Sequence, residues 1–172
     1  MRLARGLLLA SLLSAALAVG AAAATPRVQD GTLTVRDGHG SMAVKVKGSV
    51  IGRLGKGTLT VTDAPNQGAT IVVRGAERTR YPSARTTVYS GKNIRFRVAH
   101  TRPVVVQVNG KAISFSAVGR GDGWMDGRGD PVAGIFFDGS YSLNGGAYQS
   151  LPDLRTRFEL LLQPPPSPGS GG

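Results

Sequence analysis

Residues 31–37 read GTLTVRD, and residues 57–63 open with the same five letters, GTLTVTD. In both copies leucine and valine alternate with threonine or arginine. An apolar residue at every second position, rich in β-branched side chains, is typical of a strand that buries one face. Five further segments show the same alternation and predict further strands: MAVKVKG (42–48), IRFRV (94–98), VVVQVNG (104–110), AISFSAVG (112–119) and RFELLL (157–162).

Dipeptides that favour tight turns lie among these segments. Asn-Gly and Asp-Gly supply the positive φ angles that two-residue hairpins need. They occur at 37–38, 109–110, 122–123, 126–127, 138–139 and 144–145. We therefore predict an all-β fold, a mostly antiparallel sandwich or barrel of many short strands. A β-solenoid-like stack is the alternative that the two GTLTV copies suggest, although a solenoid would repeat more often at a fixed period.

The two ends of the chain differ from the middle. Residues 1–24 combine two arginines, an apolar run and small residues near Ala24, which predicts a signal peptide cleaved after that alanine. The apolar run is short for a membrane span, so we expect none after cleavage. The segment QPPPSPGSGG (163–172) predicts a disordered tail. Residues 25–162 are then a single β domain of a secreted, extracytoplasmic protein, which holds itself together without cysteine.

Positive charge dominates the chain. Lysine and arginine number 21 against 10 acidic residues, a formal net charge of +11. A domain with this charge accumulates at anionic surfaces. One hypothesis is a basic surface for anionic polymers of the cell envelope, and the alternative is a solvated face that keeps the protein soluble. Nucleic acid is a poorer partner because no DNA- or RNA-binding motif is present. The candidate anion-binding residues are Lys45, Lys47, Arg74, Arg78, Arg80, Arg95 and Arg97.

Catalytic residues are scarce. His39 lies among turn residues and His100 ends an expected strand, and neither is near a nucleophile motif. We predict no catalytic residue, no cofactor and no metal site, because cysteine, paired histidines and calcium-loop spacing are absent. A polysaccharide hydrolase stays an alternative, since two carboxylates can meet in space. Its acids would come from Asp122, Asp126, Asp130 and Asp138.

Arg-Gly-Asp occurs twice within VGRGDGWMDGRGDP (118–131). The surrounding glycines predict a hairpin edge here, and adhesion through exposed turns is a further alternative. The residues concerned are Arg120, Gly121, Asp122, Arg128, Gly129 and Asp130. Trp124, the single tryptophan, is expected to fill the core at a sheet end. The turn at Asn144-Gly145 is expected to bring Tyr141 and Tyr148 together.

The segments SAVGRGDGWMDGRG (116–129) and GSYSLNGG (139–146) resemble uncharacterised secreted glycine-rich β proteins of bacteria with high-GC genomes. This resemblance covers about the last third of the domain and implies secretion but no particular activity. Together these observations favour a secreted, non-catalytic β domain that acts at or near the cell envelope.

Overall fold

The computed structural model describes residues 29–63, 68–127 and 138–162. All six elements are strands, and every pairing between them is antiparallel. They are β1 (Gln29–Thr62), β2 (Thr70–Ser83), β3 (Thr86–Gly127), β4 (Ser140–Leu143), β5 (Gln149–Ser150) and β6 (Thr156–Leu162). The expected all-β, antiparallel class is confirmed. The expected signal peptide (1–24) and tail (163–172) lie outside the described residues.

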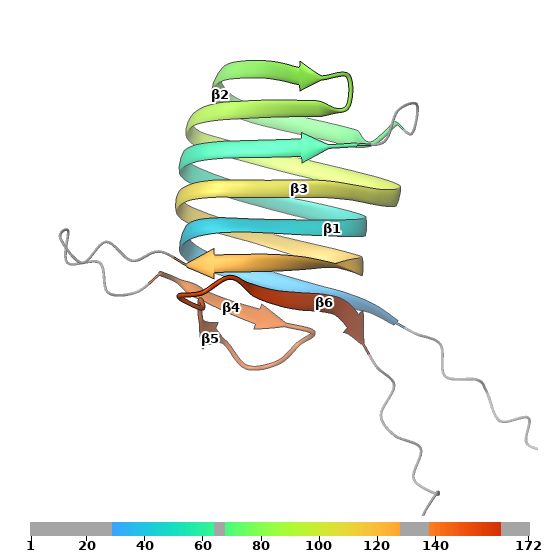
Figure 1. Ribbon diagram of the computed structural model, residues 1–172, viewed down its shortest axis with the longest axis vertical. Helices are drawn as coiled ribbons and strands as arrows, with labels where there is room; N and C mark the ends of the chain where they lie inside the picture. The colour runs from blue at the N-terminus through green and yellow to red at the C-terminus, as the bar shows by residue number, and fades with distance from the viewer. Residues whose placement is uncertain (1–28, 64–67, 128–137, 163–172) are drawn as a thin grey trace, which may run out of the picture.

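Two long strands form most of the sheet, and the short strands expected from the sequence are successive passes of these two. β1 has 34 residues and β3 has 42. β3 pairs with β1 along both of its edges: Gly110 is opposite Gly40 on one side and opposite Gly57 on the other. The β1–β3 ribbon therefore curls on itself, and its passes alternate up the molecule in Figure 1. β2 lies at one end of this curled sheet, and β4, β5 and β6 lie at the other.

The ribbon turns where glycines line up across it. Gly57 pairs with both Gly91 and Gly110, and Gly110 also pairs with Gly40. Their φ angles lie between 141° and 155°, a region that other residues avoid. A Cβ atom on Gly57 would lie 2.0 Å from the carbonyl oxygen of Asn109, so the backbones also approach too closely for a side chain. This glycine column is one corner of the curled sheet.

Most of the expected hairpin turns lie inside continuous strands. The ribbon bends without reversing near 37–38, 109–110 and 126–127, whereas 122–123 lies in the middle of a pass. The pairs at 37–38, 109–110, 122–123 and 126–127 lie within β1 or β3. Asn144-Gly145 does form the expected turn, with φ angles of 51° and 76°, between β4 and β5. Tyr141 is opposite Gln149 across this turn, so Tyr148 is not its direct partner.

Between corners, the passes form two faces. The first, which we call the arginine face, consists of residues 32–36, 49–54, 70–74, 94–99 and 113–118. The second, the opposite face, consists of residues 41–47, 58–62, 86–90, 104–109 and 120–125. Within each face the passes are neighbours in register.

The alternation in the sequence sorts side chains between the core and solvent. Leu33 and Val35 of the first GTLTV copy, and Leu59 and Val61 of the second, are at most 1% exposed and belong to one hydrophobic cluster. Burial of each such side chain contributes about 1.5–3 kcal/mol. Trp124 is not part of this cluster, contrary to expectation. It is half-buried, and the guanidinium of Arg155 stacks over its ring at 4.0 Å. Among the described residues no helix is long and apolar enough to span a membrane.

Candidate arginine groove

Three arginines from three neighbouring passes stand side by side on the arginine face. Arg53 is directly opposite Arg95, and Arg95 is directly opposite Arg74. They point outward because the residues that flank them in sequence, such as Leu54 and Ile94, are fully buried. On its other edge Arg53 is opposite Ser114. Strand pairing therefore sets an unbroken row of cations across β1, β3 and β2.

A second row runs parallel to the first, two residues further along each strand. In order across the passes it contains Thr34, Ser116, Ile51, Arg97 and Val72. The hydroxyl oxygens of Thr34 and Ser116 lie 3.5 Å apart. Ile51 and Val72 are 55% and 45% exposed, although both are large apolar side chains. This row therefore offers hydroxyl groups, apolar surface and one cation.

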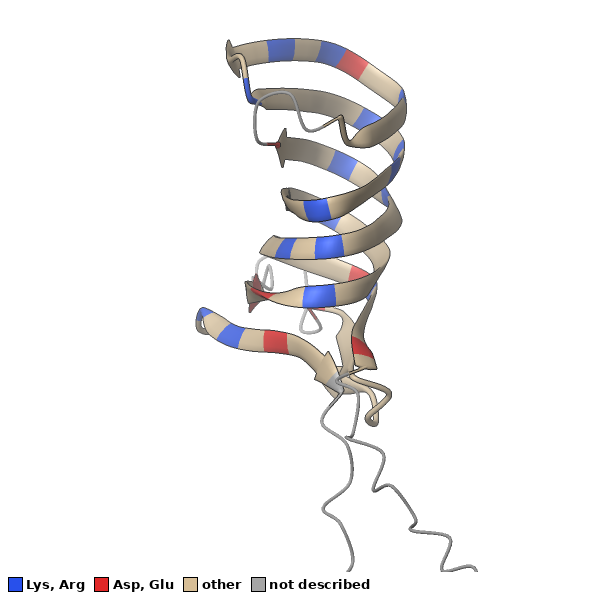
Figure 2. Ribbon diagram, turned by 90° about the vertical axis from the view of Figure 1, so that its right-hand side faces the viewer, with Lys and Arg blue, Asp and Glu red and all other residues tan. Residues whose placement is uncertain are grey.

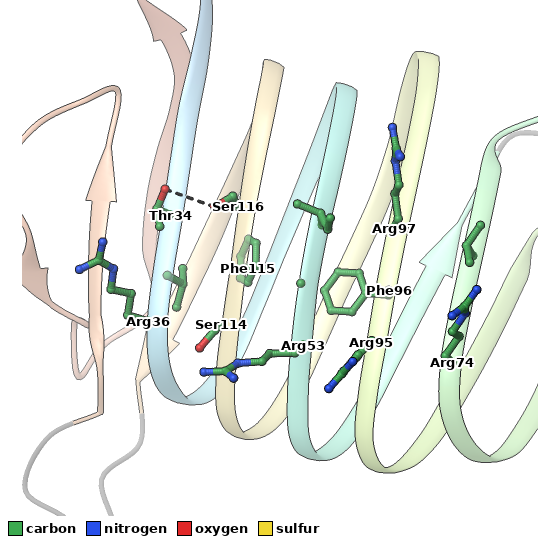
Figure 3. A pocket seen from close by; sticks show the side chains of 14 residues that line it. Thr34, Arg36, Arg53, Arg74, Arg95, Phe96, Arg97, Ser114, Phe115 and Ser116 are labelled. Atoms are coloured by element: carbon green, nitrogen blue, oxygen red, sulfur yellow. Dashed lines mark hydrogen bonds between the residues drawn. The ribbon is translucent and has the colours of Figure 1, made fainter.

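The two rows line an open groove of about 600 Å³, which we call the arginine groove. Gly52 lines this groove between Ile51 and Arg53, and the space that its side chain would need is filled from the core side by Phe96 and Phe115. A Cβ on Gly52 would lie 2.4 Å from the Cβ of Phe115 and 2.8 Å from Cζ of Phe96. Figure 3 shows the lining residues, which are Thr34, Val35, Arg36, Ile51, Gly52, Arg53, Val72, Arg74, Arg95, Phe96, Arg97, Ser114, Phe115 and Ser116.

Among the residues that the structure describes, no carboxylate lines this groove. The ion pair between Arg120 Nε and Asp30 Oδ1, at 3.0 Å, lies elsewhere. Like charges directly opposite one another destabilise a sheet by a fraction of a kcal/mol up to about 1 kcal/mol. The groove arginines therefore carry an electrostatic cost that no acidic side chain of the groove offsets, and an anion from solution would relieve it.

One end of the groove is held by an aromatic contact. The guanidinium carbon of Arg36 lies 4.1 Å from the ring centroid of Tyr148. A cation over an aromatic face gains about 0.5–1 kcal/mol at an exposed site. Figure 3 shows Arg36 separated from Arg53 by the pass that carries Ser114, with Arg95 and Arg74 on the next two passes. Arg36, which stacks on Tyr148, is a fourth arginine on the same side of the groove as the three arginines in direct register.

Cations continue beyond the groove at the nearby corner. Lys56 is directly opposite both Lys92 and Lys111. A smaller hollow, lined in part by Arg53, Arg95 and Asn93, lies on the way to this corner. Figure 2 shows lysine and arginine recurring on successive passes of the ribbon, with fewer acidic segments between them.

The structure brings together three of the seven predicted anion-binding residues. Arg74, Arg95 and Arg97 all line the arginine groove. Lys45 and Lys47 belong to the strand pass that forms the opposite face, where Lys45 is in register with Asp122. Arg78 and Arg80 are on the far half of β2, where they pair with Ser90 and Val88 of that same opposite face.

Sequence reasoning missed Arg36 and Arg53. Arg36 follows the buried Val35 in the very alternation that opens the chain's β pattern, so its outward direction could be read from the sequence. Arg53 is harder to find because Gly52 interrupts the alternation of VIGRLG (50–55). Buried Val50 and Leu54 on either side nonetheless imply that Ile51 and Arg53 face solvent.

The first Arg-Gly-Asp tripeptide is not an exposed turn. Gly121 lies within β3 and is paired with Val46 on one side and Leu160 on the other. Arg120 donates from Nε to Asp30. The expected hairpin edge is therefore a central strand pass. The second tripeptide, Arg128, Gly129 and Asp130, lies outside the described residues.

The acids considered for hydrolysis do not gather around the groove. Asp122 is opposite Glu159 on one edge and Lys45 on the other, on the opposite face. Asp126 also lies on β3, opposite Ser41. Asp130 lies outside the described residues. No group of three or more potential metal ligands occurs in the described part of the chain.

Asp138, the fourth acid considered for hydrolysis, is buried, with only 8% of its surface exposed. Burial raises the pKa of this carboxyl, as does the charge of Asp153, while His39 lowers it. Oδ1 of Asp138 and Nδ1 of His39 are buried and have no hydrogen-bond partner among the described residues. The backbone N–H of His39 donates to the carbonyl oxygen of Asp138 at 2.8 Å. His39 is thus part of β1 and not of a hairpin loop as expected.

Comparison with known proteins adds no relative. No protein-family model, curated protein or solved structure matches the chain.

Proposed function

We propose that this protein is a secreted, non-catalytic binding domain that works at or near the cell envelope and holds anionic polymers in the arginine groove. The observation that carries the proposal is the row of Arg53, Arg95 and Arg74 in direct register. No carboxylate of the described part of the chain lines the groove in which they stand. A polymer that carries several anionic groups offsets the repulsion between these arginines more fully than a single small ion does.

Arginine suits this task better than lysine. Its planar guanidinium donates two parallel hydrogen bonds to a carboxylate or phosphate and is more weakly hydrated than an ammonium group. All five cations of the groove are arginines. Lysines are instead found at the corner and on the opposite face, where Lys45 has Asp122 in register. Arginines also occur outside the groove, but the groove is set apart by five cations with no described carboxylate among its lining residues, which supports the groove and not the overall basic charge as the binding surface.

Co-sedimentation of the purified protein with envelope from its own source tests the proposal. We expect retention at low salt that falls steeply towards about 1 M, where the Debye length is about 3 Å. The double variant Arg53→Gln with Arg95→Gln should bind about tenfold more weakly or worse, because each lost charge-assisted hydrogen bond is worth about 1.5–3 kcal/mol.

The matched control removes the same charge from the opposite face, through Lys45→Gln together with Lys47→Gln. It should retain most of the binding. Equal losses in the two double variants would show that net charge alone is responsible and would contradict the proposal. Absence of retention at low salt would contradict it as well.

A further inference from the structure

The arginine groove is longer than a small anion requires. Neighbouring strands lie about 4.8 Å apart, so the passes from Arg36 to Arg74 span roughly 19 Å. Four arginines and Ser114 occupy that length in Figure 3. The groove runs across the strands, and its two rows are separated by two residues, or about 6.6 Å. This shape fits an extended chain lying perpendicular to the strands.

The second row is not built for charge alone. Ile51 and Val72 expose about half of their surface on either side of Arg97. Thr34 and Ser116 continue the same row with hydroxyl groups, which both donate and accept hydrogen bonds. A ligand that covers this row gains from burial of apolar atoms and from hydroxyl contacts, in addition to ion pairs.

We infer that the groove takes an acidic polysaccharide, with carboxylates on the arginine row and sugar rings on the row that contains Ile51 and Val72. Sugar rings combine apolar C–H faces with hydroxyl groups, which matches the chemistry of this second row. This inference rests on the proposed function and narrows it to one class of polymer. A polyphosphate chain would satisfy the arginines but leave Ile51 and Val72 in water.

The experiment compares two polyanions, oligogalacturonate and polyphosphate, by isothermal titration with the full-length protein. The affinity for oligogalacturonate should rise with oligomer length until the chain spans the row of about 19 Å. Longer oligomers should bind each groove with the same affinity. The double variant Ile51→Ser with Val72→Ser should bind oligogalacturonate at least fivefold more weakly. Its affinity for polyphosphate should change less than twofold.

Val118 supplies the matched control. It is 48% exposed and lies on the same face, opposite Ser49 and Thr32, but it does not line the groove. Val118→Ser should leave both affinities unchanged, and circular dichroism should show that all variants keep the β fold.

The titrations distinguish failure of anionic-polymer binding from failure of the polysaccharide assignment. If wild-type protein binds neither polymer, the proposed function is wrong. A second outcome is that wild-type protein binds both polymers, and the double variant at Ile51 and Val72 loses affinity for both equally or for neither. Polyanion binding is then confirmed, and the assignment to acidic polysaccharide is overturned. Preferential binding of polyphosphate by the wild-type protein would also overturn that assignment.

Discussion

At the scale of single residues, the groove arginines lower the stability of the fold and form a cationic surface. Arg95 stands between Arg53 and Arg74, so it has a like charge on both sides. On the opposite face Asp122 lies between Lys45 and Glu159, so charges of both signs meet there. A strand position selected only for stability would face an opposite charge across the sheet, and not a like charge on both sides. The cationic row therefore points to a role outside the fold.

This cost is measurable. Replacing Arg95 with Thr removes both repulsive contacts and introduces a residue that favours strands, so we expect the free energy of unfolding to rise by about 0.2–1 kcal/mol. The gain should shrink as salt screens the remaining charges. Urea unfolding at low and high ionic strength measures it. A loss of stability at low salt would mean that Arg95 stabilises the fold.

Asp138 offers a second test at this scale, through pH. Burial raises its pKa above the ordinary value of 3.8, so the folded state holds this proton more tightly than the unfolded state does. Stability from this group is therefore present below the unfolded pKa and is lost as pH rises through the folded pKa. Asp138→Asn removes that titration. The stability of the variant relative to wild type should be greater at pH 7 than at pH 3, measured by urea unfolding. A difference that does not change with pH would contradict this account.

At the scale of strands, glycine columns allow two very long strands to curl. Gly40, Gly57, Gly91 and Gly110 meet at one corner with φ angles that suit glycine alone. On the other side of the ribbon Gly48 pairs with Gly119 and with His100. Because these positions bend the strand without ending it, β1 and β3 stay continuous through each corner.

We expect Gly57→Ala to destabilise the protein more than a conformational penalty alone explains. Its new Cβ would collide with backbone, at 2.0 Å from the carbonyl oxygen of Asn109. Gly145→Ala is the control, since Gly145 has a φ of 76° and no atom within 4 Å of a built Cβ. Overpacking costs about 1–3 kcal/mol, and that difference should separate the two variants in thermal or urea unfolding. Equal losses would mean that the corner relaxes easily.

At the scale of the whole molecule, the two faces have different chemistry. The arginine face has a groove with five arginines and no acid among its lining residues. On the opposite face Lys45 and Asp122 are in register, and Arg155 stacks on Trp124 at its edge. An anionic chain would therefore meet attraction without competing carboxylates in the groove, and a mixture of signs on the other side.

The sequence predicts the direction of side chains better than it predicts their neighbours. Alternation correctly places Leu33, Val35 and Ile94 in the core and Arg95 and Arg97 in solvent. The glycine-containing dipeptides are ambiguous, because the same residues that allow a hairpin also allow a corner. The cationic row joins positions 53, 74 and 95, which are far apart in the chain. Such pairing depends on the register of long-range strands, and no local pattern encodes it.

Nuclear magnetic resonance tests most directly whether an anionic polymer binds in the arginine groove. Titration of isotopically labelled protein with oligogalacturonate would follow the Nε–H signals of the arginine side chains. We expect the largest shifts at Arg53, Arg74 and Arg95, and small shifts at Arg78 and Arg157. Shifts confined to arginines outside the groove, or spread evenly over all of them, would contradict the account.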